Sequence, residues 1–145
     1  MYGAYREYFT FMEQLGKTLD QLTELAREKT AAVRQDDLVG VDSCMKREQA
    51  LGLSLRAMDK KRDTLLAAMG LENVTLSGLV QHCPEEIRTE AKAAADKLRD
   101  RYELYRSASD VARTTLEVNL HQIEKMMADE ADAPVGGGTI ADIRA

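Results

Sequence analysis

The chain has 145 residues, of which 44% are hydrophobic and 31% charged, and its formal net charge is −5. This length fits one domain, and the acidic balance argues against nucleic-acid binding, which requires a concentrated basic surface. Tryptophan is absent and only 5% of residues are aromatic, so the core must be built from Leu, Ala, Met and Val. Such a composition is typical of an all-α protein rather than a sheet sandwich.

The sequence carries no targeting or membrane signal that we recognise. Its first residues lack a basic segment followed by an apolar run, and no stretch approaches the ~20 apolar residues that span a bilayer. We therefore expect neither secretion nor membrane insertion. The two cysteines, Cys44 and Cys83, are too few for a disulfide framework. Cytoplasmic localisation is the simplest expectation.

A first helix is predicted from Tyr5 to Val33 or Arg34, because its apolar stripe recurs in steps of three and four residues. Asp36 or Asp37 then offers an N-cap for a second helix, so the connection is short and the two helices run antiparallel. The stripe of the first helix consists of Tyr5, Tyr8, Met12, Leu15, Leu19, Leu22, Ala26, Thr30 and Val33.

The second helix is predicted to begin at Leu38 and to stop at Gly70-Leu71, where glycine adopts the left-handed conformation. Gly40 and Gly52 lower its helix propensity and allow another helix to approach closely, and a break at residues 40–42 is left open. Two charged residues, Glu48 and Arg62, lie on or beside the apolar face. Each either extends to its edge or meets an opposite charge on a neighbouring helix. The apolar face includes Leu38, Val41, Met45, Leu51, Leu55, Met58, Leu65 and Met69.

After this stop, Thr75 is predicted to cap a short crossover helix whose Leu76, Leu79 and Val80 face inward. A third long helix begins at Pro84, whose missing N–H is harmless at a first helical position, and ends before Pro134. Its apolar stripe has a mean spacing of about 3.6 residues, the period of a straight α-helix. The stripe consists of Ile87, Ala91, Ala94, Leu98, Tyr102, Tyr105, Ser109, Ala112, Leu116, Leu120, Ile123 and Met127.

The predicted fold is an all-α, antiparallel bundle of three long helices with a short crossover helix, the third long helix being the longest. The bundle domain covers residues 1–132, and residues 133–145 form a flexible tail around the glycine run at 136–138. Simple disorder of this tail and docking through Ile140 and Ile143 both stay open.

Helix lengths suggest where a partner binds. About 46 residues in the third long helix span ~69 Å, whereas the first two helices span roughly 45 to 48 Å. Tyr102 and Tyr105 suit the aromatic start of the first helix, which runs parallel to the third. We therefore expect the far end of the third long helix to project with an uncovered apolar face, a feature that marks partner sites. The candidate contacts are Ala112, Leu116, Leu120, Ile123, Met126 and Met127. Self-association, or a kink that folds the helix back, explains the excess length equally well.

No catalytic, cofactor or metal motif is present. His82 and Cys83 are adjacent and would point about 100° apart on a helix, which makes a poor chelate, and Glu117 with His121 is read as a lone surface ion pair. Gly136–Gly138 lacks the Lys-Ser/Thr of a phosphate-binding loop. We expect no enzyme activity, no cofactor and no metal.

The second helix and the crossover resemble the FlgN family of flagellar export chaperones, most closely over residues 35–80. In that pattern Arg47 matches the first basic position, Arg62 the arginine before two leucines, and Gly70-Leu71 the stop, while Ala50 replaces one leucine of a pair. The residues that carry the resemblance are Lys46 to Leu51, Leu55, Asp59, Arg62, Leu65-Leu66, Met69-Gly70-Leu71 and Thr75-Leu76.

The resemblance implies a cytosolic chaperone of type III secretion. Such a chaperone binds the C-terminal amphipathic helices of hook-filament junction proteins and delivers them to the export gate. It also implies client contacts at the end of the last helix and gate contacts in the tail through Ile140 and Ile143, although no aromatic residue follows Tyr105. The alternative from another class is a structural coiled coil or homo-oligomeric bundle. A membrane-surface helix is disfavoured by the acidic residues beside the stripe.

Overall fold

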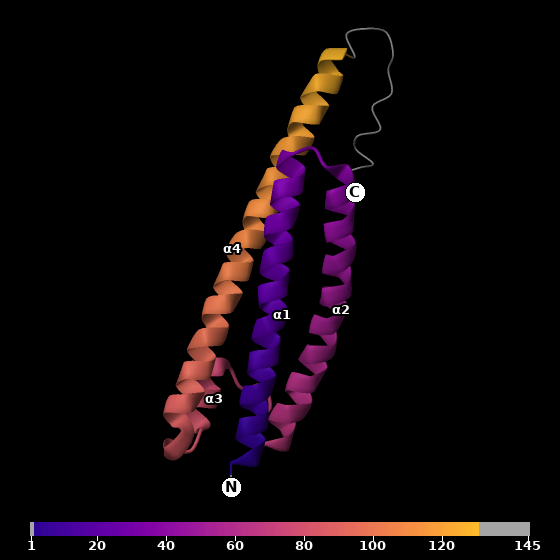
Figure 1. Ribbon diagram of the computed structural model, residues 1–145. Coiled ribbons are helices and arrows are strands. Elements are labelled where there is room, and N and C mark those ends of the chain that lie inside the picture. Colours follow the sequence, from indigo (N-terminus) through magenta and orange to yellow (C-terminus); the bar gives the residue numbers. More distant parts are fainter. Residues whose placement is uncertain (1, 131–145) are drawn as a thin grey trace.

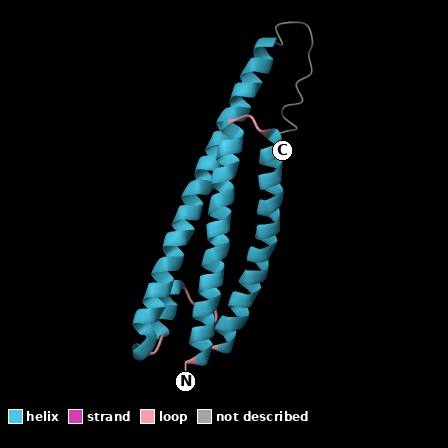
Figure 2. Ribbon diagram, in the orientation of Figure 1, coloured by secondary structure: helices cyan, strands magenta, loops and turns pink. Residues whose placement is uncertain are grey.

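The computed structural model describes residues 2–130, which form four helices and no strand (Figure 2). They are α1 (Gly3–Arg34), α2 (Leu38–Ala68), α3 (Leu76–His82) and α4 (Glu85–Glu130). The all-α prediction and the order of three long helices with one short crossover are confirmed. The predicted tail, residues 133–145, lies outside the described residues.

Helix α1 lies at the centre of the molecule (Figure 1). It packs against α4 along one side and against α2 along another, whereas no comparable packing joins α2 to α4 within residues 2–130. Helices α1 and α4 run in the same direction and α2 runs in the opposite direction, as predicted (Figure 1). The short α3 packs against α4 at the end of the molecule that holds the N-terminus.

The α1–α2 connection is short because Asp36 turns the chain at the end of α1 and Asp37 caps α2. Asp36 adopts a positive φ of 54°, and the N–H of Asp37 donates to the carbonyl oxygen of Ala32 at 2.9 Å, which closes the last turn of α1. The carboxylate of Asp37 accepts a hydrogen bond from the Gly40 N–H at 2.9 Å. Asp37 is therefore the N-cap, and α2 continues through residues 40–42 without a break.

Helix α2 ends as its sequence predicts. Gly70 has a φ of 70°, and the N–H of Leu71 donates to the carbonyl oxygen of Leu66 at 2.9 Å, which places both leucines in the core. The hydroxyl of Thr75 then accepts from the Gly78 N–H at 3.0 Å and caps α3. These local signals turn the chain back toward α4.

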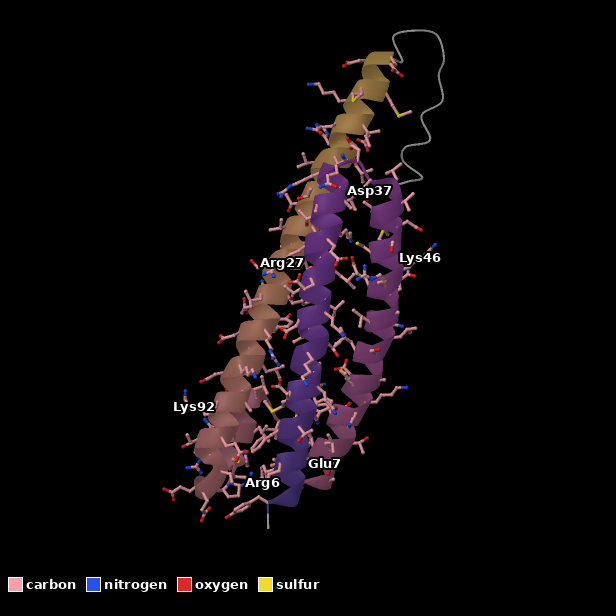
Figure 3. The ribbon with its side chains drawn as sticks, viewed as in Figure 1. Arg6, Glu7, Arg27, Asp37, Lys46 and Lys92 are labelled. Atoms are coloured by element: carbon pink, nitrogen blue, oxygen red, sulfur yellow. The ribbon has the colours of Figure 1, made fainter. Side chains whose placement is uncertain are left out.

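The main core gathers at this same end of the molecule, where all four helices contribute apolar side chains. Charged side chains such as Lys46 and Lys92 point away from the bundle on its outer sides (Figure 3). The fully buried members of the main core are Tyr8, Phe11, Met12, Leu19, Leu66, Leu71, Leu79, Ala95 and Leu98. A smaller cluster of Cys83, Ile87 and Ala91 fixes the start of α4 against the aromatic start of α1.

Candidate partner-binding surfaces

The far end of α4 projects beyond the other two long helices (Figure 1). The amide nitrogen of Asn119 donates to Asp36 Oδ1 at 3.3 Å, so the end of α1 is level with Asn119. We call residues 120–130 the projecting end, which spans about 16 Å. Helix α4 is continuous to Glu130 and does not fold back. The kink proposed as an explanation for its length is therefore wrong.

The projecting end begins about two turns later than the sequence analysis placed it. Ala112, predicted to contact a partner, is only 3% exposed, because α1 runs beside this part of α4. The expectation that the uncovered apolar face begins at Ala112 is therefore wrong. Leu116 and Leu120 are half-buried. The remaining predicted contacts are open to solvent, with Ile123 39%, Met126 67% and Met127 46% exposed.

A second apolar element at this end of the molecule was missed. Leu38 and Val39, the first residues of α2, are 78% and 81% exposed. Leu38 was predicted to lie on the inward stripe, but it is the first residue of α2 and no helical turn precedes it. The Asp37 cap immediately before them was the available signal, since it places both residues in the first turn of α2, at the end of the bundle. The end of the molecule therefore presents apolar side chains from two helices.

An apolar cavity of about 420 Å³ opens nearer the other end. This cavity was not predicted from the sequence, because its walls come from segments that are distant in the chain. Tyr102 stands at its opening with half of its surface exposed. The lining consists of Tyr8, Phe11, Met12, Leu15 and Leu19 from α1, Arg62 from α2, Val74 and Thr75, Leu76 and Leu79 from α3, and Leu98, Arg99, Tyr102 and Glu103 from α4.

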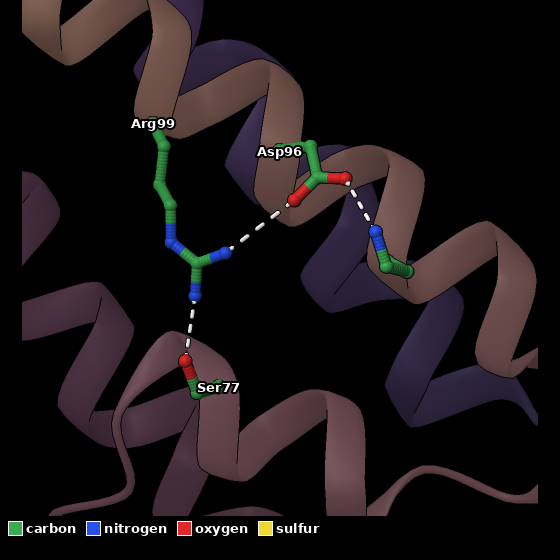
Figure 4. A network of polar contacts seen from close by, with 4 residues as sticks. Ser77, Asp96 and Arg99 are labelled. Atoms are coloured by element: carbon green, nitrogen blue, oxygen red, sulfur yellow. Dashed lines mark hydrogen bonds and ion pairs between the residues drawn. The ribbon is translucent and has the colours of Figure 1, made fainter.

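Two arginines, Arg62 and Arg99, belong to the polar part of the wall, together with Thr75 and Glu103. Arg99 donates through Nη2 to the Ser77 hydroxyl at 2.8 Å and through Nη1 to Asp96 at 3.4 Å, which ties α4 to α3 (Figure 4). Arg62 lies 3.8 Å from Asp59 and 3.6 Å from Asp63 on its own helix. Arg62 thus meets opposite charges, but on α2 itself rather than on a neighbouring helix.

The other charged residue that the sequence placed near the apolar face of α2 behaves differently. Glu48 Oε1 is buried and lies 3.5 Å from the ammonium group of Lys29 on α1, an ion pair that lacks hydrogen-bond geometry. This contact was one of the two outcomes expected for Glu48. It joins the last third of α1 to the first third of α2.

Burial also governs the titration of the tyrosine that lines the cavity. It raises the pKa of the Tyr8 hydroxyl, and the positive charge of Arg62 opposes part of that increase. The phenol stays neutral at physiological pH. Tyr8 therefore adds no negative charge to a wall whose charged residues are Arg62, Arg99 and Glu103.

Reactive groups are not assembled in the described part of the chain. Burial raises the pKa of the thiols of Cys44 and Cys83, which keeps them protonated. His82 Nδ1 lies 2.7 Å from the Gly78 carbonyl oxygen. Within residues 2–130, no three His, Cys, Asp or Glu side chains come together as a metal site. None of the described helices has the length and hydropathy that a membrane crossing needs.

Comparison with known families gives one match. The family model described as FlgN protein matches residues 1–128, which covers α1, α2, α3 and all but the last two residues of α4. Comparison with curated proteins and with solved structures gave no match. The family match confirms the resemblance found in the second helix and the crossover, and extends it over most of the chain.

Proposed function

This chain belongs to the FlgN family, whose role is that of a flagellar export chaperone, and we propose that it binds the C-terminal amphipathic helices of hook-filament junction proteins. The FlgN family is a chaperone family rather than an enzyme class. In this proposal the chaperone acts in the cytoplasm, keeps its clients from assembling, and delivers them to the export apparatus. The tail residues Ile140 and Ile143, which lie outside the described residues, would contact the export gate.

The observation that supports this proposal is the projecting end of α4. Ile123, Met126 and Met127 follow Asn119, which is level with the end of α1, and they are exposed. An amphipathic client helix that packs its apolar stripe against them would remove this surface from water. Methionine suits such a site because its flexible thioether side chain adapts to different client residues. Half-buried Leu116 and Leu120 would extend the contact toward the bundle.

Titration with client peptides tests the proposal. We expect one-to-one binding of synthetic peptides from the C-termini of junction proteins, and about tenfold weaker binding for Ile123→Asp or Met126→Asp. Losing the burial of one apolar side chain costs about 1.5 to 3 kcal/mol of binding free energy, which corresponds to at least about a tenfold loss of affinity. The matched control is Gln122→Asp, which adds the same charge in the same exposed turn. Equal affinities for Ile123→Asp and Gln122→Asp would place the client elsewhere.

The same surface could instead bind a second copy of the chain, as the homo-oligomer alternative requires. Sedimentation velocity at several concentrations separates the two functions. A dimer that persists in the presence of every junction-protein peptide would favour the structural alternative and count against a chaperone site. Dissociation of any dimer into one-to-one complexes on adding peptide would support the chaperone.

A further inference from the structure

The apolar cavity is not explained by the proposed client contact at the projecting end, which lies toward the opposite end of α4. We propose that it is an anchor site for bulky apolar side chains of an acidic amphipathic helix, supplied by the exported client. This inference rests on the proposed function and adds a second contact, in which the client helix crosses α1 between α2 and α4.

A short amphipathic helix, α3, already occupies the space next to the cavity. Helix α3 packs on α4 and contributes Leu76 and Leu79, spaced three residues apart, to the wall of the same cavity. The chain therefore already places one short amphipathic helix, with leucines at helical spacing, against this surface. The cavity continues past the start of α3 at Val74 and Thr75. A second helical segment with similar spacing would meet the same kind of surface.

The volume of the cavity suits bulky side chains. An apolar cavity of about 150 Å³ holds one benzene molecule, so 420 Å³ has room for two or more bulky side chains. Most of the lining residues are Leu, Met, Val and aromatic side chains, and the polar ones come from α2, from Thr75 before α3, and from α4. Apolar side chains that project from a helix match this arrangement better than a small polar ligand, which would need several convergent hydrogen-bonding groups.

The charged residues of the cavity lining bear on the charge of the partner. Arg62 and Arg99 line the cavity, and the ammonium group of Lys61 lies 5.9 Å from the ring centre of Phe11, which also lines it. Glu103 is the one acidic residue in the lining, so its two arginines leave an excess of one positive charge there, on a chain whose net charge is −5. Asp59, Asp63 and Asp96 pair with these arginines from outside the lining. The ion pairs of Arg62 are long and exposed, and such pairs contribute little. Arg62 is therefore available to an acidic residue of the partner.

A fluorescent probe at the opening tests this docking directly. The chain contains no tryptophan, so Tyr102→Trp introduces a single emitter there. We expect its emission to shift to the blue when a junction-protein peptide without tryptophan binds. The control is Leu104→Trp, at an exposed position of α4 outside the cavity, which should not shift. Equal shifts, or no shift at Tyr102→Trp despite measured binding, would overturn the inference.

A charge-reversal pair tests the basic opening. Arg62→Glu should weaken peptide binding by about tenfold, the factor typical of losing one well-placed charged contact. Arg56→Glu, an exposed arginine on the same helix that does not line the cavity, should weaken it by less than about twofold. Neutralising the acidic residues of the peptide should remove the difference between the two variants. Equal weakening by both variants would contradict an acidic partner.

The outcomes keep this inference separate from the proposed function. If no junction-protein peptide binds the unmodified chain, the proposed function fails. If peptides bind and Ile123→Asp weakens them, but the signals from Tyr102→Trp and Arg62→Glu match those of their controls, the chaperone function stands and the anchor site is wrong. A blue shift of Tyr102→Trp that grows with protein concentration in the absence of peptide would assign the cavity to a second copy and overturn the client assignment.

Discussion

Arg101 shows how a single side chain sets the distance between α1 and α4. Its guanidinium lies 3.3 Å from Glu13 and 3.4 Å from Asp20, and only 18% of its side chain is exposed. A Cβ built on Gly16 would overlap the Arg101 side chain. A hydrogen bond from Lys97, together with the charge of Arg101, lowers the pKa of Glu13. Gly16 is thus buried in α1 because Arg101 crosses it.

We predict opposite effects from two glycine-to-alanine changes. Gly52→Ala should raise the free energy of unfolding by up to about 1 kcal/mol, because alanine favours helix and nothing lies within 4 Å of the new Cβ. Gly16→Ala should lower it, because the displaced Arg101 loses Glu13 and Asp20. Urea unfolding followed by circular dichroism measures both. In an Arg101→Ala background, Gly16→Ala should become stabilising, and persistent destabilisation there would contradict this role of Arg101.

The glycines also show which contacts of a single residue can be predicted from the sequence. Gly40 and Gly52 were predicted to allow another helix to approach closely. A Cβ at Gly40 would lie 3.3 Å from Ala32 Cβ of α1, and it would also meet the Asp37 carboxylate that caps its own helix, whereas nothing lies within 4 Å of one at Gly52. Gly16 was not singled out. A glycine is visible in a sequence, whereas the side chain that faces it depends on the register between α1 and α4, which no local signal specifies.

At the level of whole elements, the boundaries were predictable and the register was not. The caps Asp37 and Thr75, the stop at Gly70 and the start after Pro84 are local hydrogen-bonding and dihedral effects, and each was identified from neighbouring residues. The length of the projecting end depends on how α4 slides along α1. That offset is fixed by contacts between distant residues. For this reason Ala112 was predicted to be exposed although it is buried.

The long helices differ in how firmly they are held. Helix α2 has only Cys44 and Leu66 fully buried, although it is about as long as α1, which buries side chains along its whole length. We predict that amides in the middle of α2 exchange hydrogen faster than those of α1 and of α4 before Asn119, because opening α2 exposes less apolar surface. The projecting end should exchange fastest of the described helices. Hydrogen exchange followed by mass spectrometry measures this order, and uniform protection would contradict it.

For the molecule as a whole, the open arrangement links client binding to stability. Helix α1 joins α2 to α4, and the proposed client helix would touch all three near Arg62 and Tyr102. Peptide at about 100 times its dissociation constant should stabilise the fold by about 2.7 kcal/mol and raise the Tm by roughly 5 to 10 °C.

The location of the added protection distinguishes the two proposed contacts. If the client bridges α2 and α4, hydrogen exchange should slow in α2 around Arg62 as well as in the projecting end, because the peptide closes the side of α1 that both helices leave open. Arg62→Glu should abolish the protection in α2 while leaving that of the projecting end, and Ile123→Asp should do the reverse. Protection confined to the projecting end in the unmodified chain would mean that the client binds there alone and that the cavity takes no part.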